Sequence, residues 1–261
     1  MSKQKTRTSR LHFESLEPRK MLTHLVPECT LRAAITLSHL QAGHDIIGFH
    51  QHDQSHQPNI IVNSNADSNL DTNQPGNVND WECTTGQMVE PIRPSEIVVL
   101  NDSLGSLPAI VDTAGTEIVA DHNRINGNHP GVVVVPANPA VAKSSFQRGL
   151  EVRGDESDIA GFVIQQWFIG IELEGSVNSI GGNNIGTDRL GSTTIESNTF
   201  GVWVNAVNNT KIGAIDLMAS GVSAPSNWIS GNDFEGVRIV GGNETSFYHN
   251  RIGLDLSLIH I

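Results

Sequence analysis

The segment Asn198–Val204, NTFGVWV, is nearly repeated at Asn232–Ile239, NDFEGVRI. A shorter copy, GIEL, occupies Gly170–Leu173. In each copy a glycine precedes an apolar, a variable and a second apolar residue, which is the alternation of a β-strand with one buried face. Imperfect repeats of short strands, each too small to bury its own apolar side chains, are typical of a solenoid.

A second repeated element, Ile-Gly preceded by a polar residue, follows each copy at Asn184–Gly186, Lys211–Gly213 and Arg251–Gly253. Glycine and asparagine readily adopt the backbone conformations of tight turns. Such short turns leave no room for the helical crossovers of βαβ units, and a coil stacked on itself needs none. We predict an all-β parallel solenoid over residues 95–256, with about six or seven coils.

The repeat residues are expected to be structural. Phe200 and Phe234 are predicted to stack inside the coil, and asparagine side chains to bond along its axis. Asp188 and Asp255 follow repeated glycines and are expected to close their own turns, with Ca²⁺ binding as the alternative. The repeat set is Asn184, Gly186, Asn198, Phe200, Gly201, Asn232, Phe234, Gly236 and Gly253.

The charge of the chain is −12 and is unevenly distributed. Residues 1–22 hold six of the 16 basic and two of the 28 acidic side chains, which leaves 10 basic and 26 acidic ones, a net −16, in the remainder. A body this acidic argues against nucleic acid and anionic lipid as partners. The sequence has no apolar run of about 18 residues, so we predict no membrane span, and we expect a monomer.

Residues 1–22 are read as a flexible leader that lacks the apolar core of a conventional secretory signal. Within it, His12–Leu22, HFESLEPRKML, resembles the LEPR-XLL motif of large surface or exported planctomycete proteins. The resemblance implies an extracellular or cell-surface location, reached by a route other than a conventional signal peptide. One disulfide between Cys29 and Cys83 is an open alternative at this stage.

Residues 23–49 are predicted to cap the solenoid. Thr30 is placed to cap a short helix in which Leu31, Ala34 and Ile35 share one face. The segment CTLRAAI at Cys29–Ile35, followed by GHDIIGF, resembles the CSLREA motif. That resemblance implies a right-handed single-stranded parallel β-helix of the pectate-lyase-like kind, with a short N-terminal capping helix.

Two stretches stand outside this pattern. Residues 50–94 are so polar that we predict a disordered loop, in which His50, His52 and His56 are weak candidates for a metal site. Residues 257–261 resemble a translated sequencing adaptor, and we expect the reading frame to be truncated there.

Enzyme signatures of β-helix hydrolases and lyases are missing from the sequence. Hydrolases need paired carboxylates, and lyases need acidic Ca²⁺ ligands with a nearby basic residue. The nearest group is Arg153, Asp155, Glu156 and Asp158, which we expect to be an ordinary charged turn. We therefore assign no catalytic residue and no cofactor, with Ca²⁺ left open.

The strongest surface candidate comes from aligning the repeats. The middle residues of the three strands, Glu172, Trp203 and Arg238, are predicted to point outward and to lie in line. A tryptophan between charged groups suits a sugar platform, and the alternative is a purely structural Trp203–Arg238 cation–π contact. We expect a non-catalytic, secreted or cell-surface scaffold for adhesion or carbohydrate contact. The alternative is a polysaccharide lyase or glycoside hydrolase acting on acidic polysaccharide.

Overall fold

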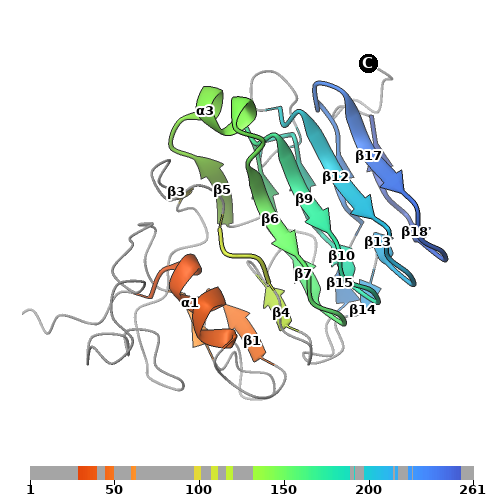
Figure 1. The fold of residues 1–261 in the computed structure, drawn as a ribbon, viewed down its shortest axis with the longest axis horizontal. Coiled ribbons are helices and arrows are strands. Elements are labelled where there is room, and N and C mark those ends of the chain that lie inside the picture. The colour runs from red at the N-terminus through yellow and green to blue at the C-terminus, as the bar shows by residue number, and fades with distance from the viewer. Residues whose placement is uncertain are drawn as a thin grey trace, which may run out of the picture.

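The computed structural model describes residues 29–39, 45–49, 60–62, 97–100, 107–110, 116–119, 132–188, 191, 197–213, 215–216, 223–224 and 226–253. Strands dominate this part of the chain, and nearly all of them pair in parallel (Figure 1). No helix within it is both long and apolar enough to cross a bilayer.

A short helix, α1 (Leu31–Ser38), lies at the N-terminal end of the strands, beside β1 (Asp45–Gly48) (Figure 1). As predicted, Thr30 is its N-cap, because the Thr30 hydroxyl accepts a hydrogen bond from the Ala33 amide at 3.1 Å. Leu31, Ala34 and Ile35 are fully buried against the core. Cys29, just before the helix, is disulfide-bonded, and Cys83 is the only other cysteine in the sequence.

The strands form three parallel sheets. Sheet A runs β18-β13-β10-β7-β4-β1-β2, sheet B runs β19-β16-β11-β8-β5-β3, and sheet C runs β17-β12-β9-β6. Sheet A comprises β2 (Ile60–Ile61), β4 (Thr116–Val119), β7 (Asp158–Ala160), β10 (Ser179–Gly181), β13 (Lys211–Gly213) and β18 (Ser246–Tyr248), besides β1. Sheet B comprises β3 (Ile97–Leu100), β5 (Val132–Pro136), β8 (Phe162–Ile164), β11 (Asn184–Ile185), β16 (Trp228–Ile229) and β19 (Arg251–Ile252). Sheet C comprises β6 (Arg148–Val152), β9 (Ile169–Leu173), β12 (Phe200–Asn205) and β17 (Glu235–Val240).

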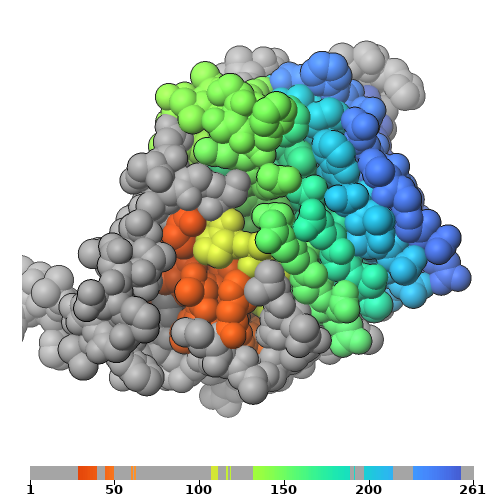
Figure 2. All heavy atoms as spheres, viewed as in Figure 1, coloured from red at the N-terminus to blue at the C-terminus, as the bar shows by residue number. Residues whose placement is uncertain are grey.

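From β6 onward the chain visits sheets C, A and B in turn. The sequence of strands β6, β7, β8 is followed by β9, β10, β11, then by β12, β13, β16 and by β17, β18, β19. We call each such passage a coil. In the space-filling view the coils lie side by side as bands that run from green to blue (Figure 2). Each coil therefore buries its apolar side chains against the coils before and after it.

The core lies between the three sheets. Its members repeat by position: Leu150, Ile171 and Val202 are paired in register across sheet C and are almost fully buried. Alternation of inward and outward residues stops at the glycine of each repeat. A Cβ on Gly201 would lie 3.0 Å from Ile229 Cγ2 in the core, so Gly201 and Val202 both face inward.

Asparagine ladders connect the coils, as the repeats predict. Asn183 Nδ2 donates to Asn227 Oδ1 at 3.0 Å, and Asn227 Nδ2 donates to Asn250 Oδ1 at 3.0 Å. In a second ladder, Asn198 Nδ2 donates to Asn232 Oδ1 at 3.2 Å. These amides satisfy backbone groups at the corners, where no strand pairing is available.

Three elements differ from the sequence-based expectations. The prediction of a disordered loop over 50–94 is wrong at Ile60–Ile61, since this short apolar run forms β2 and pairs with Ile47 and Gly48 of β1. Helix α3 (Pro139–Ser144), capped by Asn138, was not anticipated. Neither was the antiparallel hairpin of β14 (Ile215–Asp216) and β15 (Ser223–Ala224). Residues 1–22 and 257–261, and the histidines at 50, 52 and 56, lie outside the described residues.

Candidate functional site

The outer face of sheet C carries the predicted line of side chains. Trp203 of β12 is in register with Arg238 of β17 and with Glu172 of β9. Glu172 is in turn in register with Glu151 of β6. Neighbouring strands are about 4.8 Å apart, so these four side chains form one continuous row, which we call the sheet C row.

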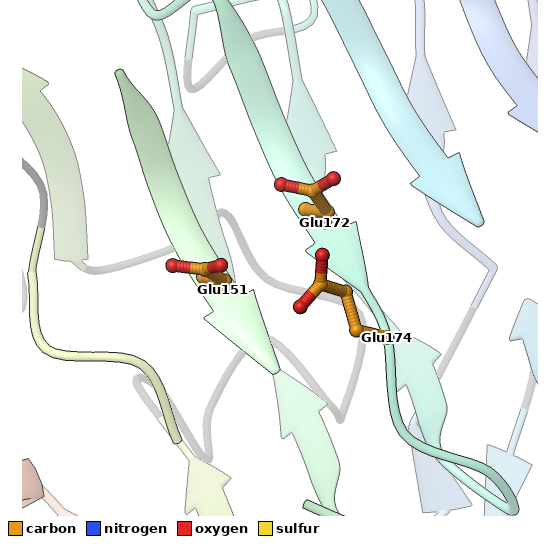
Figure 3. A group of neighbouring side chains, drawn as sticks. All are labelled: Glu151, Glu172 and Glu174. Atoms are coloured by element: carbon orange, nitrogen blue, oxygen red, sulfur yellow. The ribbon is translucent and has the colours of Figure 1, made fainter. Parts of the chain in front are cut away.

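The β6–β9 end of this row is acidic. Carboxylate oxygens of Glu151, Glu172 and Glu174 lie within 4.8 Å of one another (Figure 3). Glu151 and Glu172 are buried, and Glu174 is exposed. Positive charge among three carboxylates this close relieves their repulsion.

Two arginines supply that charge. Arg148 Nε donates to Glu172 Oε2, and Arg153 Nη2 donates to Glu151 Oε1 at 2.7 Å. Arg153 Nε also lies 3.2 Å from Glu174 Oε2. The hydrogen bonds and charge of Glu151, with a smaller contribution from Glu174, raise the pKa of Arg153 above its usual value.

Carboxylate oxygens are the ligands that Ca²⁺ prefers, so the cluster has suitable donor atoms. However, Arg153 contacts two of the three carboxylates and Arg148 the third, so a cation would have to displace these guanidinium groups. The geometry favours an ionic network that holds β6 against β9. Calcium binding is the open alternative to the assignment of no cofactor.

The β12–β17 end of the row is aromatic and cationic. The Arg238 guanidinium carbon lies 4.6 Å from the centroid of the Trp203 ring and 5.5 Å from that of Phe200. Arg238 makes no ion pair within the described part of the chain. Trp203 Nε1 is buried without a hydrogen-bond partner there. A guanidinium held over aromatic rings still presents N–H groups that can meet acceptors.

A file of phenylalanines runs beside the row. Ring centroids are 4.6 Å apart for Phe146–Phe168, 5.4 Å for Phe168–Phe200 and 5.7 Å for Phe200–Phe234. Phe200 and Phe234 stack as predicted, with planes 22° apart. The prediction that they stack inside the coil is wrong, because Phe234 is 76% exposed and Phe200 is half-buried. Gly201 takes the inward position, which turns Phe200 outward.

A polar clasp links α3 to the last described coil. Lys143 Nζ donates to Asp233 Oδ2 at 2.8 Å and to Ser197 Oγ at 3.1 Å. Partial burial acts to raise the pKa of Asp233, but hydrogen bonds from Lys143 and Ser197 and the Lys143 charge outweigh it. The pKa of Asp233 therefore lies below its ordinary value.

This clasp makes stability depend on pH in a defined direction. A carboxyl whose pKa is lowered by folding stabilises the protein above its ordinary pKa and loses that contribution as the pH falls. We expect the wild type to lose more stability than Lys143→Met between about pH 6 and about pH 3. Urea unfolding at both pH values measures this loss of stability for each protein. Equal losses in the two proteins would contradict the role of Lys143.

The charged turn after β6 does not form a cluster of its own. Asp155 Oδ1 accepts a hydrogen bond from the Ser176 amide at 2.7 Å, and Asp158 is buried in β7. Glu156 is exposed with a φ of 60°. Only Arg153 of this group joins the acidic end of the row.

The two aspartates expected to close turns have different outcomes. Asp255 lies outside the described residues, and the Asp188 backbone carbonyl accepts a hydrogen bond from Asn184 Nδ2 at 2.7 Å.

The sequence analysis missed the partners of the acidic end. Arg148 and Glu172 are 24 residues apart in the sequence. The one signal that would have placed them on neighbouring strands is the recurrence of glycine at positions 149 and 170, one in each strand. The site as a whole offers carboxylates paired with arginines at one end, and at the other a cation on aromatic rings that has no ion-pair partner among the described residues. Comparison with protein-family models, with curated proteins and with solved structures gave no match.

Proposed function

We propose that the chain is a secreted or cell-surface right-handed parallel β-helix of the pectate-lyase-like kind, capped by α1, that binds carbohydrate without catalysis. Three parallel sheets visited in turn and a helix at one end support the architecture. The bonded state of Cys29 supports an oxidising, extracytoplasmic compartment.

The observation that carries the function is the half-buried surface of Trp203 and Phe200 beneath Arg238. Aromatic faces stack on the apolar faces of sugar rings, and the N–H groups of Arg238, which have no hydrogen-bond partner among the described residues, can meet hydroxyl or carboxylate oxygens. An extended row on a flat sheet suits a polymer, which can lie along successive coils.

Trp203→Ala tests this proposal. We expect binding on a glycan array to weaken by at least about tenfold, because the stacking surface is lost. The matched control is Trp228→Ala, since Trp228 lies under Arg251 on sheet B in the same kind of contact, 5.0 Å from its guanidinium carbon. Equal glycan binding by the wild type and Trp203→Ala would show that the sheet C row is not a glycan-binding site.

The alternative, a polysaccharide lyase or glycoside hydrolase, depends on the cluster of Glu151, Glu172 and Glu174. Glu172 is 3% exposed and paired with Arg148, so little of it is open to a substrate. We therefore expect no depolymerisation of uronic-acid polymers, with or without Ca²⁺. Product release that is lost in Glu172→Gln would establish the enzyme instead.

A further inference from the structure

The last described coil, β17–β18–β19, leaves its inward side chains open. Ile239, Phe247 and Ile252 are 46%, 42% and 40% exposed, whereas the residues in register with them one coil earlier are fully buried. β17 is the edge strand of sheet C, and among the described strands it pairs only with β12. Figure 1 shows β17 and β18 at the outer end of the stack.

A cavity of about 300 Å³ lies at this end, between β16, β17 and β19. Its lining is Ile229, Ser230, Gly231, Asn232, Phe234, Gly236, Ile252 and Gly253. Ser230 is 2% exposed, and its hydroxyl has no hydrogen-bond partner in the described part of the protein. A buried hydroxyl of this kind costs free energy until an acceptor or donor reaches it.

The earlier coils show what fills the equivalent position. A Cβ on Gly149 would lie 3.0 Å from Trp167, one on Gly170 3.0 Å from Asn198 Nδ2, and one on Gly201 2.8 Å from Asn232 Nδ2. In each case the side chain arrives with the strand that follows in sheet C. At Gly236 the described structure has the cavity instead.

The glycines show how the following strand lies. Cβ atoms on Gly149, Gly170 and Gly201 would be 2.7, 2.6 and 2.3 Å from the carbonyl oxygen of the next glycine in the column. Glycine is required there because the next parallel strand passes so close. For a Cβ on Gly236 the nearest atoms are Ile252 Cγ2 at 3.1 Å and atoms of Ile229 at 3.4 Å or more. No described strand follows β17 in sheet C, so Gly236 has the glycine of its column but no described neighbour that requires it.

We propose that this end binds an extended polypeptide segment, which adds to sheet C as a strand parallel to β17. An asparagine of that segment enters the cavity beside Ser230, and apolar residues at alternate positions cover Val237 and Ile239. Strand addition to an open sheet edge takes its affinity from the backbone and its specificity from such side-chain sites. The partner is therefore a peptide segment with the pattern of this chain's own repeat.

The test uses the full chain and a fluorescent peptide of the sequence Ser197–Asn205 as the probe. Fluorescence anisotropy is expected to show saturable binding. Replacing the peptide's second residue, the asparagine that corresponds to Asn198, by leucine is expected to weaken binding by at least about tenfold, because an amide hydrogen-bond network is lost. Gly236→Val in the protein should abolish binding, because its side chain occupies the cavity. Circular dichroism checks that this variant remains folded.

Trp203→Ala is the control, since the Trp203 side chain lies on the outer face of β12, one strand in from the open edge, and not in the cavity. This variant should bind the peptide as the wild type does, so this proposal and the glycan proposal fail independently. Absence of peptide binding by folded wild type would overturn the inference. So would binding that survives Gly236→Val. Sedimentation showing that two copies of the protein close this end on each other, without competition from the peptide, would assign the surface to a dimer instead.

Discussion

Gly201→Ala is expected to destabilise the protein by about 3 kcal/mol or more. The new Cβ would lie 2.3 Å from the Gly236 carbonyl oxygen and 3.0 Å from Ile229 Cγ2. The first of these atoms belongs to the backbone of β17, so relief requires moving a whole strand. Urea unfolding, followed by circular dichroism, measures the loss.

Gly236→Ala is the matched control, because it is the same change one coil later. There the Cβ would meet no backbone atom closer than 3.7 Å, and its nearest neighbour is a methyl group of the exposed Ile252 side chain at 3.1 Å. We expect a loss of less than about 1 kcal/mol. Equal losses at the two positions would mean that the coils are not stacked as closely as the structure shows.

Asn227→Ala is expected to cost about 3 kcal/mol, the second large effect. Asn227 Oδ1 accepts from both the backbone amide and the side-chain amide of Asn183, each at 3.0 Å. Its Nδ2 donates to the Ile180 carbonyl at 2.9 Å and to Asn250 Oδ1 at 3.0 Å. Removing the side chain leaves several buried groups unpaired at once, and each is costly.

Asn243→Ala provides the comparison, since Asn243 is exposed and its side chain takes no part in the ladder. Its expected effect is within about 0.5 kcal/mol. Thermal unfolding of both variants, at one pH and salt concentration, separates the ladder from a general effect of losing asparagine. Similar melting temperatures for the two variants would contradict the ladder's contribution.

Much of the strand pattern followed from the repeats, because alternation within a strand is a local property. The repeat copies at Gly170–Leu173, Asn198–Val204 and Asn232–Ile239 coincide with β9, β12 and β17, respectively. Alternation failed at Gly201, where two consecutive residues face inward and Phe200 is displaced to the outside. Alternation along one strand cannot predict this exception, because its cause is the close approach of a different strand, β17.

The sequence predicted which side chains line up across sheet C, but not which arginines pair with the glutamates. The repeat alignment places Glu172, Trp203 and Arg238 side by side, and the strand register agrees. The arginine partners of Glu172 and Glu151 depend on side-chain conformations across coils. Helix α3 was missed although Asn138 and Pro139 form a favourable helix start, because six residues carry too little periodicity.

The hairpin of β14 and β15 has a practical consequence. It occupies the corner between β13 and β16 and is one of the two longer connections that place Asn183 and Asn227 44 residues apart, whereas Asn227 and Asn250 are only 23 apart. Both pairs nevertheless bond at the same 3.0 Å. The number of residues at this corner therefore does not change the distance between neighbouring coils. Foreign loops, such as an epitope or a second binding module, can be grafted there while the scaffold keeps its shape.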